Sequence, residues 1–145
     1  MRTSDSPAAA GDVVNADFSA GHTITLGNGN NDVVDAKFSS GDIITVGNGN
    51  DTIHVGIANT VTVGTGQDRF VFDQTVPSTI GAVTINGFDA SKDVIVMQQT
   101  LASTFSVHDD VHGNAVISFA GDNSDSITLV GVHASALHSS DFQLV

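Results

Sequence analysis

Three glycine-rich segments recur along the first half of the chain, and each ends in an aspartate that is followed by alternating apolar residues. They read GNGNND at 27–32, GNGND at 47–51 and GTGQD at 64–68. The first two begin 20 residues apart, and the second and third begin 17 residues apart. A short motif at a near-fixed spacing is typical of stacked structural units rather than of a single isolated site.

The segments between these turns alternate apolar and polar residues, which predicts short strands with one apolar face. Each repeat holds two such strands, as in HTITLG at 22–27 and DIITVG at 42–47. Because each copy returns in the same sense as the last, parallel stacking of coils is expected. The side chains expected to point into the core are Val14, Ala16, Phe18, Val34, Ala36, Phe38, Ile53, Val55, Ile57, Phe70 and Phe72 from the first ladder, with Ile24, Leu26, Ile44, Val46, Val61 and Val63 from the returning strands.

We therefore predict an all-β fold, a short right-handed parallel β-roll or β-helix with a β-rich C-terminal cap. The expected divisions are a flexible tail at 1–10, the roll at 11–73 and the cap at 74–145. A cap is expected because a bare final coil would expose unpaired backbone groups and apolar core. The only helical candidate is one or two turns at 134–139, before a last strand at 142–145.

The turns have the chemistry of a calcium site. Glycine lets the backbone turn and leaves carbonyl oxygens pointing inward, and the closing aspartate adds a carboxylate. Calcium takes about six to eight oxygens, which two stacked turns can supply and one turn cannot. Sites are expected between the first and second turns and between the second and third. The candidate ligands are Asn28, Asn30, Asp32, Gly47, Asn48, Asn50, Asp51, Gly64, Thr65, Gln67 and Asp68.

The turns resemble the calcium-binding nonapeptide of RTX (repeats-in-toxin, hemolysin-type) proteins, Gly-Gly-x-Gly-x-Asp-x-U-x with U a large apolar residue. GNGNDTIH at 47–54 and GTGQDRF at 64–70 match it from the second glycine onward. The resemblance implies a parallel β-roll in which calcium is bound between turns by backbone carbonyls and by Asp51 and Asp68. It also implies a chain that stays loose in a calcium-poor cytoplasm, leaves through a type I exporter and folds outside.

The match to the motif has gaps. Apolar Leu26, Val46 and Val63 stand where the first glycine belongs, and the first turn carries one extra residue, Asn31. The turns at the opposite ends of the strands lack the motif, and only Asp42 among them could bind a metal. One row of sites is therefore expected, holding one to three ions. The segments at 85–97, 126–132 and 141–145 are also similar to the ends of proteins exported by type I secretion.

Composition limits the partners. The formal net charge is −12, which argues against nucleic acid or an anionic membrane and leaves a chain that repels itself until cations neutralise it. There is no cysteine, no apolar run long enough to span a bilayer, and no secretory-type apolar stretch in residues 1–10. The expected partners are calcium, type I secretion machinery and extracellular polysaccharide, and the expected location is extracellular or at the cell surface.

The pair His108 and His112 suggests a metal site on a helix, but the flanking residues alternate as strands. A hairpin turning at 112–114 is the better interpretation. The acidic pairs Asp109–Asp110 and Asp122–Asp125 are interpreted as solvated loop residues. No nucleophile elbow, zinc helix, phosphate loop or dinucleotide fingerprint is present, so we do not expect an enzyme.

Three alternatives stay open. The turns could be bare structural corners whose asparagines form hydrogen-bonded ladders, so that the roll is a calcium-free scaffold. The chain could be a glycan-binding or adhesion module appended to a larger adhesin or polysaccharide-modifying enzyme. Finally, Thr25, Thr45 and Thr62 are expected to align on an outward face, and regular threonine rows can match ice or another crystal. Ile43 interrupts the neighbouring row, and threonine is in any case favoured in strands.

Overall fold

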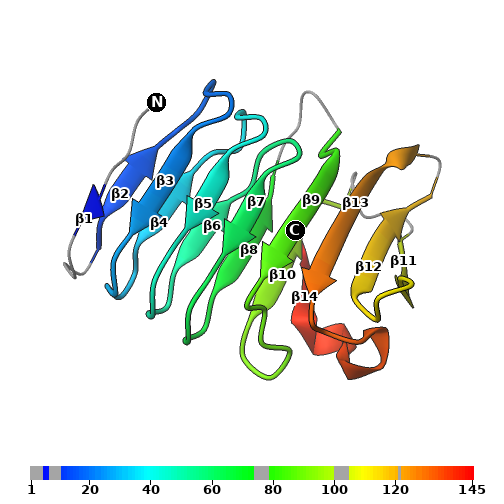
Figure 1. The fold of residues 1–145 in the computed structure, drawn as a ribbon. Coiled ribbons are helices and arrows are strands. Elements are labelled where there is room, and N and C mark those ends of the chain that lie inside the picture. The colour runs from blue at the N-terminus through cyan, green and yellow to red at the C-terminus, as the bar shows by residue number, and fades with distance from the viewer. Residues whose placement is uncertain (1–4, 7–10, 74–78, 100–104, 121) are drawn as a thin grey trace.

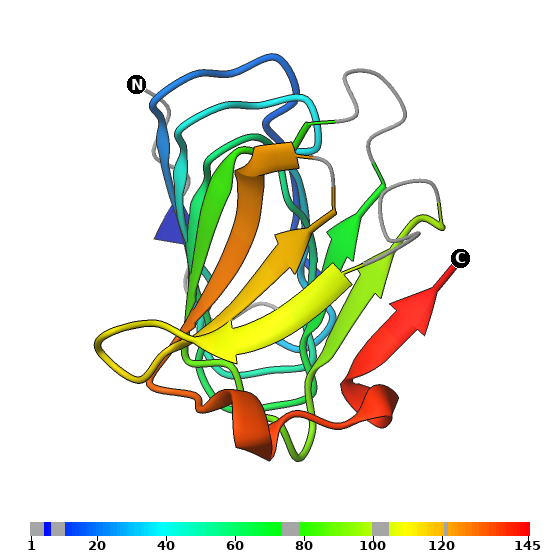
Figure 2. The ribbon, with the colours of Figure 1, turned by 90° about the vertical axis from the view of Figure 1, so that its right-hand side faces the viewer.

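The computed structural model describes residues 5–6, 11–73, 79–99, 105–120 and 122–145 of the chain. Two β-sheets face each other, and the chain crosses from one to the other once in each half-coil (Figure 1). The view along the roll shows the coils superposed around a common interior (Figure 2). No helix in the described part of the chain is long and apolar enough to cross a membrane.

The larger sheet, called sheet A, has eight strands in the order β1-β3-β5-β7-β9-β13-β12-β11. Sheet B has six strands in the order β14-β10-β8-β6-β4-β2. The strands of sheet A are β1 (Asp5–Ser6), β3 (Thr23–Leu26), β5 (Ile43–Thr45), β7 (Thr60–Thr62), β9 (Ala82–Asn86), β11 (Phe105–Asp109), β12 (Ala115–Phe119) and β13 (Asp122–Val130). Those of sheet B are β2 (Val13–Asn15), β4 (Val33–Asp35), β6 (Thr52–His54), β8 (Arg69–Phe72), β10 (Val94–Met97) and β14 (Phe142–Leu144).

Parallel pairing brings equivalent residues of successive coils into register. In sheet B one apolar row runs through Val14, Val34, Ile53, Phe70 and Ile95. A matching row in sheet A runs through Ile24, Ile44, Val61, Ile85 and Leu129. Apart from half-buried Val14, every member of the two rows is at most 2 % exposed. Fully burying an aliphatic or aromatic side chain of this size stabilises a fold by about 1.5–3 kcal/mol, so these two rows dominate the core.

The parallel sheets continue past residue 73. Strands β9 and β13 extend sheet A in parallel, and β10 and β14 extend sheet B. The antiparallel hairpin β11–β12 then lies across the last coil, where Phe105 contacts Phe142 at a ring separation of 5.0 Å. The all-β parallel roll predicted from the sequence is confirmed, as is the hairpin turning at 112–114. Both sheets continue across the division expected at residue 73. The division into a roll and a separate cap stays a prediction.

The C-terminal segment is mostly as expected. Two single-turn 3-10 helices, at Ala134–Ala136 and Ser139–Asp141, precede β14. Of the tail expected at 1–10, only Asp5 and Ser6 are described, and they pair in parallel with Thr25 and Leu26.

The prediction that Phe18 and Phe38 point into the core is wrong. Phe18 is 84 % exposed and Phe38 is half-buried, and their rings stack on the surface with centroids 5.4 Å apart. The chain has already left the strand at these positions, because Phe18 has a φ of 62° and the next serine donates its N–H back to Ala16. Ile57, expected inside, is half-buried at the corresponding corner of the next coil.

Candidate calcium-binding corner

An aspartate stands immediately before each of the first five strands of sheet B, and together they form a hydrogen-bonded ladder along the roll. Four of the five carboxylates accept, through Oδ1, the backbone N–H of the aspartate one coil earlier. The donor–acceptor pairs are Asp12 to Asp32 (2.9 Å), Asp32 to Asp51 (3.0 Å), Asp51 to Asp68 (2.9 Å) and Asp68 to Asp93 (2.9 Å). The ladder explains why the aspartate recurs at this position, since each N–H lies at a corner where the strand ladder has not yet begun.

The second oxygens of three of these carboxylates have no partner. Each of these residues, Asp32, Asp51 and Asp68, is only about 1 % exposed. In each of them Oδ2 is buried and makes no hydrogen bond within the described residues. Asp93 differs, because its Oδ1 accepts from Asp68 and its Oδ2 accepts from Asp89 at 2.8 Å. A buried carboxylate oxygen without a donor carries a large desolvation penalty. The ladder therefore has three open acceptors and one closed end.

The pKa values reflect this arrangement. Burial, together with the neighbouring carboxylates of Asp93 and Asp51, raises the pKa of Asp68 to about 6. Burial also raises the pKa of Asp51 and of Asp93, in each case with a smaller contribution from a nearby aspartate. Asp89, at the closed end, behaves oppositely: hydrogen bonds from Ser91 and Lys92 lower its pKa to about 2. The interior of the ladder is thus a row of like charges that raise one another's pKa.

The glycines of the corner are required by close stacking. A Cβ on Gly66 would overlap the carbonyl group of Gly49, and one on Gly64 would lie 2.5 Å from the carbonyl oxygen of Gly47. Backbones of successive turns can approach this closely only without side chains. The same stacking brings backbone carbonyls of adjacent coils to the corner. The extra residue of the first turn, Asn31, is accommodated by a left-handed conformation with a φ of 65°.

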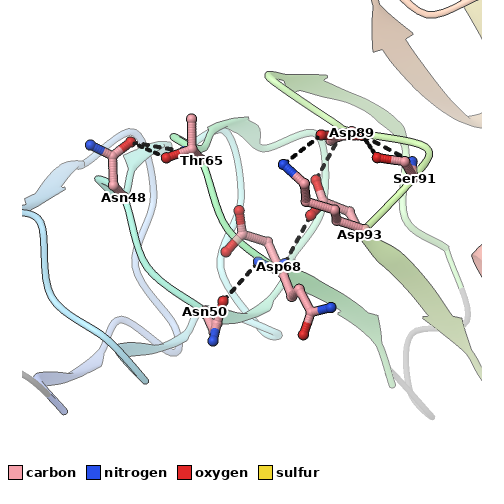
Figure 3. Close-up of polar contacts among 9 residues, drawn as sticks. Asn48, Asn50, Thr65, Asp68, Asp89, Ser91 and Asp93 are labelled. Atoms are coloured by element: carbon pink, nitrogen blue, oxygen red, sulfur yellow. Dashed lines mark hydrogen bonds and ion pairs between the residues drawn. The ribbon is translucent and has the colours of Figure 1, made fainter.

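The asparagines form ladders of their own. Oδ1 of Asn28 accepts the N–H of Asn48 at 2.9 Å, and Oδ1 of Asn48 accepts both the N–H and the hydroxyl of Thr65. Oδ1 of Asn50 accepts the N–H of Gln67 at 2.9 Å. In Figure 3 the Asn48–Thr65 pair lies apart from Asn50 and Asp68. The predicted ligands therefore lie along two lines. The first line holds Asn28, Asn48 and Thr65, and the second line holds Asn50 and Gln67. Only the second line lies beside the open carboxylates.

A hollow of about 350 Å³ opens beside that second line, and the residues lining it include Asn50, Asp51, Gln67, Asp68, Arg69 and Lys92. The first four were predicted from the sequence, whereas Arg69 and Lys92 were not. Asp93 and Asp89 were also missed as members of the site, although Asp93-Val94 repeats the pattern of an aspartate before an apolar strand. Within the described residues, no three histidine, cysteine or acidic side chains form a metal cluster by themselves. A metal here would depend on carbonyl and amide oxygens as well.

At the opposite corner, both oxygens of the Asp42 carboxylate are hydrogen-bonded. Asp42, the one metal candidate there, is fully buried, and its Oδ1 accepts the N–H of His22 at 2.8 Å while its Oδ2 accepts the hydroxyl of Ser19 at 2.5 Å. Asp125, expected to be a solvated loop acid, is instead 4 % exposed and accepts hydrogen bonds from Thr79, Ile80 and Gly81. That expectation was wrong because the parallel pairing of β13 with β9 brings the carboxylate to the residues just before β9, a pairing that the local sequence does not reveal.

Comparison with known proteins supports the fold. No protein-family model matches the sequence, and no match is found among curated proteins. A solved structure that is similar is the solution structure of the AlgE6R3 subunit from the Azotobacter vinelandii mannuronan C5-epimerase. It is 22 % identical to this chain, with a TM-score of 0.56, and the match covers 92 % of this chain and 79 % of that one. At this identity the similarity establishes a shared β-roll fold.

Proposed function

We propose that this chain is a non-catalytic calcium-binding module of the RTX kind, which holds Ca²⁺ between stacked corners before the strands of sheet B. The observation that carries the proposal is the set of open Oδ2 atoms on Asp32, Asp51 and Asp68, buried in a row and lacking any donor. A structure without a cation would leave three carboxylates unpaired, which is costly unless something neutralises them.

The donor set favours calcium over other metals. Only oxygen donors occur in these corners: carboxylates, backbone carbonyls and the side-chain amides of Asn30, Asn50 and Gln67. Hard oxygens in a flexible set of about six to eight suit calcium, whereas magnesium demands a rigid octahedron and zinc prefers histidine or cysteine. Asp32 with Asp51 would serve one ion and Asp51 with Asp68 the next, with the side-chain oxygens of Asn50 and Gln67 as neutral candidates.

Calcium would act on folding. The chain carries a net charge of −12, and the ladder concentrates carboxylates in its interior. A cation that binds only the assembled corners adds its binding free energy to the stability of the folded state. Together with the RTX resemblance, this supports a module that completes its fold outside the cell after export by a type I route. The parent polypeptide would then be secreted or held at the cell surface.

Polysaccharide binding is the second candidate. The similar fold belongs to an epimerase of mannuronan, which is a polysaccharide. In addition, Arg69 and Lys92, two of the four basic side chains in the sequence, line the hollow beside the open carboxylates. A glycan-binding module of a larger adhesin or polysaccharide-modifying enzyme would use such cations on an otherwise acidic surface.

Calcium titration followed by calorimetry and far-UV circular dichroism tests the first proposal. The variant Asp51→Asn/Asp68→Asn removes two carboxylates that have open oxygens, and Asp42→Asn is the matched control at the satisfied corner. The wild type and the control are expected to bind calcium with the same stoichiometry and to gain β signal. The double variant is expected to lose both responses. Equal calcium binding by all three proteins would refute the assignment.

A further inference from the structure

The outward face of sheet A carries threonine in register across five strands. One row runs through Thr23, Ile43, Thr60, Thr84 and Thr128, and the next through Thr25, Thr45, Thr62, Asn86 and Val130. Seven of these ten positions are threonine. Only three coils were apparent from the sequence, but the parallel pairing of β9 and β13 widens the array to five strands.

This face carries no charge, although the chain as a whole is strongly acidic. The outward positions of β3, β5, β7 and β9 and those of residues 124–130 in β13 hold only Thr, Ser, Asn, Ala, Ile and Val. By contrast, the outward face of sheet B includes Asp35, His54 and Arg69. No acidic residue therefore stands among these outward positions, and Asp5 of the neighbouring edge strand β1, which pairs with Thr25, lies beyond the end of the array. A charged side chain holds its own hydration shell firmly, so a charge-free face suits an uncharged partner.

The spacing of the array is set by the backbone. Adjacent strands lie about 4.7–4.9 Å apart, and alternate residues along one strand lie about 6.6 Å apart. The directions of β3, β5, β7 and β9 are nearly the same in Figure 1, so the in-register residues of these four strands repeat at regular intervals. The threonine hydroxyls are also free to bond outward. Within the described residues only Thr62 has a partner, a long contact of 3.5 Å from Asn86.

We propose that this threonine face binds ice. A rigid grid of methyl and hydroxyl groups fits a partner whose own groups repeat at fixed spacing and carry no net charge, which is the surface of a crystal of water. A flexible polymer would gain nothing from the regularity of the grid. A crystalline neutral polysaccharide would be favoured by aromatic rings that stack on sugars, but no aromatic residue occurs among the outward positions of these five strands.

Residue 43 supplies the sharpest test, because Ile43 interrupts a row of threonines and is 52 % exposed. Ile43→Thr completes the row and is expected to raise ice binding. Ile43→Lys places a charge within the threonine array and is expected to abolish ice binding. The matched control is Val13→Lys, which puts the same charge on the outward face of sheet B, where Val13 is 72 % exposed.

Two readouts are used on the full chain with saturating calcium: the fraction of protein taken up by a slowly growing ice crystal, and inhibition of ice recrystallisation. Far-UV circular dichroism of each variant first confirms an unchanged β content. Ice uptake by the wild type and by Val13→Lys, together with the opposite changes at residue 43, supports the proposal. No uptake by a folded wild-type protein would overturn it, as would retention on microcrystalline cellulose in place of ice. The outcome is independent of the calcium proposal, since folding is verified separately.

Discussion

The open carboxylates predict an unusual pH dependence of stability when calcium is absent. The pKa of Asp68 is about 6 in the folded chain and 3.8 without the fold's influence. Between these values the folded state binds more protons than the unfolded state, so stability falls as pH rises through this window. The calcium-free protein is therefore expected to be more stable at pH 4.5 than at pH 7. Most soluble domains show the opposite trend: they lose stability as the pH falls, because their paired carboxylates become protonated.

The size of the effect follows from the same values. A difference of one pKa unit corresponds to about 1.4 kcal/mol, so Asp68 alone would contribute at most about 3 kcal/mol between pH 4 and pH 7. Asp51 and Asp93 act in the same direction, because burial raises their pKa values too. Asp89, whose pKa is lowered to about 2, acts in the opposite direction but only below about pH 4. A comparison restricted to pH 4.5–7 therefore excludes the contribution of Asp89.

The assay is urea unfolding followed by far-UV circular dichroism at several pH values, in a chelator and again in excess calcium. In the chelator, the midpoint should move to higher urea as the pH falls. In calcium, the trend should weaken or reverse, since protons then compete with the ion for the same oxygens. The variant Asp68→Asn cannot titrate at this position and should show a smaller slope in the chelator. A calcium-free stability that is constant or rises from pH 4.5 to pH 7 would refute the reasoning.

Three further predictions concern packing and the two corners. Gly66→Ala should prevent stacking of the second and third turns. In the control Gly131→Ala, nothing lies within 4 Å of the added Cβ, so the cost should be only the strain of its positive φ, about 1 kcal/mol. The melting temperatures of the two variants distinguish these outcomes. Ile53→Ala should destabilise by about 2–5 kcal/mol, because the side chain is fully buried, while Ile43→Ala on the exposed face should change the free energy of unfolding by less than about 0.5 kcal/mol. Asp42→Asn should destabilise by about 1–3 kcal/mol to the same extent with and without calcium, in equilibrium urea titrations.

The repeated part of the roll was predictable because two signals agree there. Alternation placed Ile24, Ile44 and Val61 in one apolar row, and the glycine-rich turns set the coil length that brings them into register. The same alternation failed at Phe18, because β2 ends at Asn15 and Phe18 lies in the turn that follows. A local pattern cannot reveal where a strand ends when the corner is set by contacts with the next coil.

Pairings between segments that are distant in the sequence could not be predicted from local sequence patterns either. Strand β13 lies parallel to β9, which brings Asp125 to the N–H groups of Ile80 and Gly81, more than forty residues away. Asp93 joins the ladder for the same reason, although no Gly-x-Gly turn precedes it. The candidate site was therefore only partly predictable: its repeated aspartates were found, but its closed end and its basic neighbours Arg69 and Lys92 were not.

The ladder also separates the role of the aspartates in the fold from their role in calcium binding. One oxygen of Asp32, Asp51, Asp68 and Asp93 accepts the N–H of the previous coil and needs no cation to make that bond. The other oxygen has no such partner on Asp32, Asp51 and Asp68. A domain of this size is stable by only about 5–15 kcal/mol, so a few kcal/mol of unrelieved charge is a large fraction of the total. Calcium at 100 times its dissociation constant would return about 2.7 kcal/mol per site, enough to determine whether the coils stay stacked. Because each added coil brings one more half-satisfied carboxylate, dependence on calcium should grow with the number of glycine-rich turns and end at Asp93, where both oxygens are bonded.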